Sequence, residues 1–106
     1  MPKFLLEVTY TAGGAQGVLK DGGSKRRAAA KTLVESLGGK LESIYFAFGK
    51  HDAIVIADLP DNAAAAASAL ALSASGMLTA TTTVLLTPEE IDQAIKKPGT
   101  YTPPGR

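Results

Sequence analysis

The sequence contains no cysteine, and it has a single histidine among its 106 residues. The absence of thiols excludes disulfide bonds, thiolate metal sites and thiol catalysis. One histidine is too few for the usual zinc or copper site, although it would suffice as an axial ligand to haem. We therefore expect neither a metal nor a cofactor.

The sequence also lacks a large net charge and long apolar runs. Eleven basic and ten acidic residues leave a formal net charge of +1, which is low for a protein that binds a phosphate backbone. No apolar stretch is long enough to cross a bilayer, and the amino end lacks the basic and apolar regions of a secretory signal. We expect a cytoplasmic protein without a nucleic-acid or membrane partner.

The length is sufficient for one hydrophobic core and too short for two ordinary ones. We predict one domain over residues 1–97. Residues 98–106 contain three prolines and two glycines, which is typical of an extended or disordered tail.

Hydrophobic periodicity predicts four strands and three helices. Alternating or continuous apolar runs indicate strands over residues 3–11, 41–48, 53–57 and 78–86. Helical spacing and capping residues indicate a helix from Ser24 to Leu37, a second from Asp61 or Asn62 to Ser75, and a short third one from Pro88. The glycine-rich residues 12–23 read as a loop or a loosely formed turn.

Helix ends carry recognisable signals. One glycine of Gly38-Gly39 is expected in the left-handed conformation that ends the first helix, and Gly76 is expected to end the second. The segment from Thr87 to Glu90 has the spacing of a capping box, with proline at the first helical position. In this last helix we expect an inward stripe made of Ile91, Ala94 and Ile95.

The element order predicts an α+β fold of ferredoxin-like βαββαβ topology with a short C-terminal helix and a four-stranded antiparallel sheet. Two helices cover only one sheet face, yet the second and third strands carry apolar residues on both faces. Ile44 and Phe46 alternate with Tyr45, and Ile54 and Ile56 alternate with Val55. We therefore expect a homodimer joined through the sheet face; whether dimers assemble further stays open.

These residues resemble the GYD-domain family, within the dimeric α/β-barrel superfamily, over roughly residues 1–96. The resemblance rests on Tyr10-Thr11, the helix start at Ser24, the break at Gly38-Gly39, the Tyr45 strand, and Gly49-Lys50-His51-Asp52 before an apolar strand. The family tetrapeptide is similar to Gly-x-Tyr-Asp, so His51 replaces its tyrosine. The resemblance implies two sheets paired around a cavity, and it implies little about a reaction.

His51 and Asp52 are the one place where an imidazole adjoins a carboxylate, which could orient a general base. Consecutive residues of an extended chain point to opposite sides, so we favour a turn function for Asp52 over catalysis.

A group of aromatic side chains could line an apolar ligand cavity at the sheet interface, or could simply form the core of the dimer. Hydroxyls from two of its tyrosines and from Thr81 or Thr83 would suit a ligand. With His51, the candidate ligand-binding residues are Tyr10, Tyr45, Phe46 and Phe48; Phe4 belongs to the same aromatic group.

The stretch from Gly22 to Arg27 combines free backbone amides with three cations, a setting for anions. A phosphate loop is absent and the cations oppose the helix dipole, so a solvated basic corner is the favoured interpretation.

Taken together, the residues favour a homodimeric sensor or carrier domain that binds a small organic molecule in an apolar pocket between the sheet and its partner. The alternative is a cofactor-independent monooxygenase- or isomerase-like enzyme that uses His51 or a tyrosine for proton transfer. A third possibility is an assembly protein without any cavity.

Overall fold

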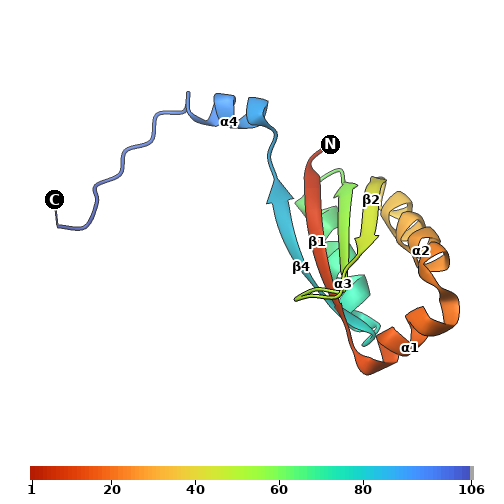
Figure 1. The fold of residues 1–106 in the computed structure, drawn as a ribbon. Helices are drawn as coiled ribbons and strands as arrows, with labels where there is room; N and C mark the ends of the chain where they lie inside the picture. Colours follow the sequence, from red (N-terminus) through yellow and green to blue (C-terminus); the bar gives the residue numbers. More distant parts are fainter. Residues whose placement is uncertain (106) are drawn as a thin grey trace.

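The computed structural model describes residues 1–105. Four strands form one antiparallel sheet in the order β2-β3-β1-β4. They are β1 (Lys3–Tyr10), β2 (Lys40–Phe46), β3 (Ala53–Asp58) and β4 (Leu78–Leu85). The four helices are α1 (Ala12–Asp21), α2 (Gly23–Ser36), α3 (Asn62–Ala74) and α4 (Pro88–Ala94). The predicted α+β ferredoxin-like fold is confirmed (Figure 1).

The core lies between the sheet and the helices on one of its faces. On β1 the alternation places Phe4, Leu6 and Val8 on this helix-covered face, where each is at most 5% exposed. Phe4 and Leu6 join Val34 of α2 and Ala65 of α3 in the main buried cluster, and Val8 belongs to a second, smaller one. We call the other side of the sheet the open face; it carries Leu5, Glu7 and Thr9 of the same strand.

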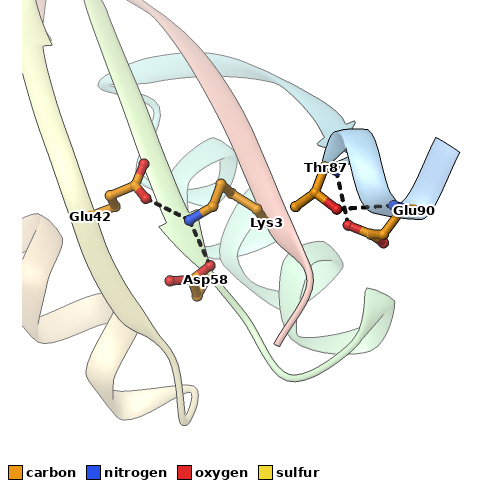
Figure 2. A network of polar contacts seen from close by, with 5 residues as sticks. All are labelled: Lys3, Glu42, Asp58, Thr87 and Glu90. Carbon is orange, nitrogen blue, oxygen red and sulfur yellow. Dashed lines mark hydrogen bonds and ion pairs between the residues drawn. The ribbon is translucent and has the colours of Figure 1, made fainter. Parts of the chain in front are cut away.

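Two local signals act as predicted. Asp61 caps α3 by accepting a hydrogen bond from the Ala64 N–H at 2.8 Å, and Gly38 has a φ of +81° just after α2. A third is the capping box of α4: the Thr87 hydroxyl accepts from the Glu90 N–H, and the Glu90 carboxylate accepts from the Thr87 N–H (Figure 2).

The loop predicted over residues 12–23 is wrong, because most of this stretch forms α1. The Thr11 hydroxyl caps it by accepting from the Gly14 N–H at 3.2 Å. Gly14 is buried, and a Cβ atom there would lie 1.9 Å from the Met77 carbonyl oxygen. Glycine at this position therefore allows close packing of α1 against the start of β4. From the sequence alone, the same glycines indicate a break in helical structure.

Two further details differ from the predictions. The second strand ends at Phe46, so Phe48 lies in the loop before β3 and is fully exposed. The inward stripe expected on the last helix is also wrong: α4 lies away from the body of the domain and has no buried residue, with Ile91 and Ile95 exposed (Figure 1). Its capping box specifies a helix locally, without any contact that would cover its apolar side.

Candidate functional site

A hollow of about 90 Å³ lies inside the domain, between the sheet and helices α2 and α3. All of its lining residues are aliphatic except Tyr10, Arg26 and Ser68. Its wall on α2 includes Ala29 and Ala30, whose side chains are too short to fill the space above the sheet. Small residues on α2, at Ala29 and Ala30, therefore contribute to the hollow.

A wider hollow of about 350 Å³ adjoins the first, next to α1 and the end of α3. Four residues line both hollows: Tyr10, Arg26, Leu72 and Leu78. The Tyr10 ring lies against Gly14, where an added Cβ would come within 2.9 Å of the ring. Gly14 therefore leaves room for this aromatic wall.

Arg26 is the only charged residue on the walls of either hollow, within the part of the chain that the structure describes. Its side chain is 33% exposed, and its Nη1 atom lies 3.8 Å from Oδ2 of Asp21. That distance is longer than a hydrogen bond, so the guanidinium N–H groups do not donate hydrogen bonds to Asp21. The neighbouring cations Lys25 and Arg27 are exposed and do not line these hollows.

The open face has an apolar centre. Leu5, Ile54 and Ile56 are half-buried there, in register across β1 and β3, and Tyr45 next to Ile54 is 71% exposed. Along β4 this face carries Thr79, Thr81 and Thr83. The two-sided apolar character predicted for β3 is present, with Val55 buried on the helix-covered face.

His51 lies over one end of the open face, where its partner is Glu7 and not Asp52. Its Nε2 atom is 3.3 Å from Oε2 of Glu7, and its Nδ1 atom is 3.4 Å from the Thr9 hydroxyl. A carboxylate next to an imidazole can hold the ring in place. Sequence reasoning missed Glu7 because the contact depends on how the loop folds back over β1.

Asp52 instead has a structural role in the loop. Its Oδ2 atom accepts a hydrogen bond from the Tyr10 N–H at 2.8 Å, and its own N–H donates to the Val8 carbonyl at 2.7 Å. The Asp52 carbonyl also accepts from the Ala47 N–H, which closes the connection between β2 and β3. These bonds agree with the predicted turn function of this residue.

An ionic cluster occupies the other end of the open face. Nζ of Lys3 donates to Glu42 at 2.6 Å and to Asp58 at 2.9 Å (Figure 2). These two hydrogen bonds, first that to Glu42 and then that to Asp58, raise the pKa of the Lys3 amine above its ordinary value of 10.5. The open face is therefore apolar in the middle and charged at both ends.

The candidate residues named from the sequence do not meet at one site in the chain. Tyr10 lines the hollows on the helix-covered face, whereas Tyr45 and His51 lie on the open face. Phe46 faces Gly23 at the start of α2, and Phe48 lies in the exposed loop. Arg26 and Ser68 of the hollow were not singled out for a pocket, because helix positions reveal a cavity only once the helices are placed on the sheet.

Within residues 1–105, no helix has the length and apolar character needed to cross a membrane, and no group of three His, Cys, Asp or Glu side chains is placed to hold a metal ion. Comparisons with curated proteins and with solved structures found no match. The model of the GYD domain matches residues 4–95 of the sequence. This stretch covers the four strands, except for Lys3 at the start of β1, and the helices around the hollows. The chain therefore belongs to the GYD-domain family.

Proposed function

We propose that this protein is a sensor or carrier module that binds a small, largely apolar organic molecule and has no chemistry of its own. The observation that carries the proposal is the aliphatic hollow between the sheet and helices α2 and α3. The pocket expected between the sheet and a partner is thereby moved to the helix-covered face.

An unfilled hollow lowers the free energy of unfolding of a small domain. Protein interiors are normally close-packed, and unfilled space costs about 24 cal/mol per Å³. For a closed cavity of the observed volume, about 90 Å³, this amounts to about 2 kcal/mol; the hollow is partly open at the exposed Ala29 and at Arg26, so this value is an upper bound. A bound molecule that fills the hollow would recover this free energy, which makes ligand binding a physical reason for the small residues on its wall.

We further propose that two copies pair through the open face. The support is that Leu5, Ile54 and Ile56 are only half-buried in the single chain, so each would gain a part of the about 1.5–3 kcal/mol that full burial of an exposed side chain of this kind provides. The charged clusters at the two ends of this face would then limit the ways in which two sheets can be superimposed.

Native mass spectrometry of the protein as purified tests both parts together. We expect a dimer that carries a retained small molecule. A matched pair of variants locates the ligand: Ala30→Leu places a larger side chain on the wall of the hollow, and Ala28→Leu makes the same change at an exposed position of α2 outside that wall.

We expect Ala30→Leu to lose the retained molecule and Ala28→Leu to keep it. Filling the hollow should also raise the stability of the ligand-free protein, by about 1 kcal/mol. Retention of the molecule by both variants, with unchanged stability, would place the ligand elsewhere and contradict the proposal.

The pairing of His51 with Glu7 favours one second candidate, a cofactor-independent oxygenase or isomerase with His51 as general base. In this alternative Glu7, rather than Asp52, orients the imidazole. The test uses the molecule identified by native mass spectrometry, incubated in aerated buffer with the wild type and with His51→Ala. Conversion by the wild type alone would establish the enzyme, and an unchanged molecule in both samples would exclude this role.

A further inference from the structure

The hollow combines an aliphatic wall with one guanidinium group, and this pairing defines the chemical class of molecule that fits it. Arg26 lines both adjoining hollows, and no acidic residue lines either of them in the part of the chain that the structure describes. The remaining polar groups on the walls are the hydroxyls of Tyr10, Ser68 and Ser75. An ammonium ligand would meet a like charge here, and a neutral one would desolvate the guanidinium without supplying an anion to it, leaving only the long 3.8 Å contact with Asp21.

We propose that the site takes a small organic acid, with its aliphatic or aromatic body in the hollow and its carboxylate on Arg26. The proposal rests on the proposed binding function and adds the ligand class to it. A guanidinium presents two parallel N–H donors that match a carboxylate, and the long contact with Asp21 leaves them available.

The position of Arg26 in its helix supports the same ligand class. Arg26 lies near the start of α2, where a cation opposes the helix dipole. The first turn contains no acidic residue, and the preceding Gly22 provides no side-chain cap. Asp21, which precedes the helix, is shared between Lys25 at 3.7 Å and Arg26 at 3.8 Å. A bound carboxylate would add a second anion for Arg26 at a point where the helix itself favours one.

Binding of octanoate and of its neutral analogue octanamide, measured by calorimetry, tests the ligand class; phenylacetate and phenylacetamide form a second pair with a different shape. We expect the wild type to bind the acid of at least one pair about tenfold or more tightly than its amide. In each titration, shifts of the Leu72 and Leu78 amide resonances show whether the molecule enters the hollows.

Arg26→Gln should remove the preference for the acid and leave the affinity for the amide unchanged. The matched control is Arg27→Gln, which changes the exposed neighbour on the same helix and should behave as the wild type. Equal binding of acid and amide, or a preference that survives Arg26→Gln, would overturn the ligand class and leave the binding function intact. Absence of binding by all four molecules would overturn both.

Discussion

The two faces of the sheet are made by the same four strands, yet they differ in how their apolar side chains are covered. On β1, Phe4 is 1% and Leu6 4% exposed beneath the helices, whereas Leu5 between them remains half-buried on the open face. The helix-covered face contains a hollow with one cation on its wall, and the open face has an apolar centre between two charged clusters. We have proposed a different task for each face: the helix-covered face for binding a small molecule and the open face for pairing with a second sheet.

The largest expected effect comes from truncating neighbours on opposite faces of β1. Phe4→Ala should lower the free energy of unfolding by about 3–5 kcal/mol, because it empties a site that is closed on all sides. Leu5→Ala should cost less than half as much in dilute protein, where the open face is free. Urea denaturation measures both values, and equal losses would mean that the two faces are equally covered within one chain.

Ile56→Lys is the second test, and it concerns pairing of the open face. The side chain is half-exposed beside Asp58, so a lysine can reach solvent in the single chain. In a dimer it would bury an added charge, because the neighbouring Asp58 is already paired with Lys3. We expect the dissociation constant to rise by about thirtyfold or more, equivalent to about 2 kcal/mol. Sedimentation velocity measures this change.

The control for that test is Leu70→Lys, which introduces the same charge at a side chain of α3 that is 71% exposed. It should leave the association unchanged. If Leu70→Lys dissociates the dimer and Ile56→Lys does not, the dimer interface lies on the helices and not on the open face of the sheet.

The third test concerns the loop that holds His51 over the open face. Asp52→Ala removes the acceptor for the Tyr10 N–H, and leaving this partly buried donor unpaired should cost about 1–2 kcal/mol. Asp52→Asn keeps a side-chain oxygen and should lose much less. Thermal unfolding compares the two variants, and equal losses would show that the negative charge, rather than the accepted hydrogen bond, stabilises the loop.

The sequence predicts those parts of the fold that short-range signals specify. The capping box at Thr87, the cap at Asp61 and the left-handed Gly38 depend on residues a few positions apart, so they can be read directly. Helix α1 was missed because Gly14 serves a contact with Met77, far along the chain. Without tertiary contacts, a glycine needed for close packing cannot be distinguished from one that breaks a helix.

The candidate site was less predictable than the fold for the same reason. His51 contacts Glu7, although the two residues are 44 positions apart in the sequence. The contact depends on the path of a loop, which hydrophobic periodicity does not predict. Arg26 is one of three cations in the stretch from Gly22 to Arg27, which was interpreted as a solvated corner. Only the placement of α2 on the sheet shows that Arg26 lines a hollow. Phe48 was assigned to a strand because its alternation continues beyond the last hydrogen-bonded pair.

The smallest expected effect comes from the charged end of the open face. Because Glu42 and Asp58 raise the pKa of the Lys3 amine, this cluster stabilises the fold at pH values below 10.5. The contribution should disappear as the pH rises through the elevated pKa of the folded state. Lys3→Met should therefore be less stable than the wild type well below this pH and should match it well above.

Lys40→Met is the control, since this exposed lysine also begins a strand. Urea midpoints of the three proteins on both sides of pH 10.5 give the comparison. The side chain of Lys3 is 31% exposed, so solvent screens the cluster and the difference should be small. A difference between Lys3→Met and the wild type that persists at high pH would assign the effect to packing of the lysine stem on the open face rather than to its charge.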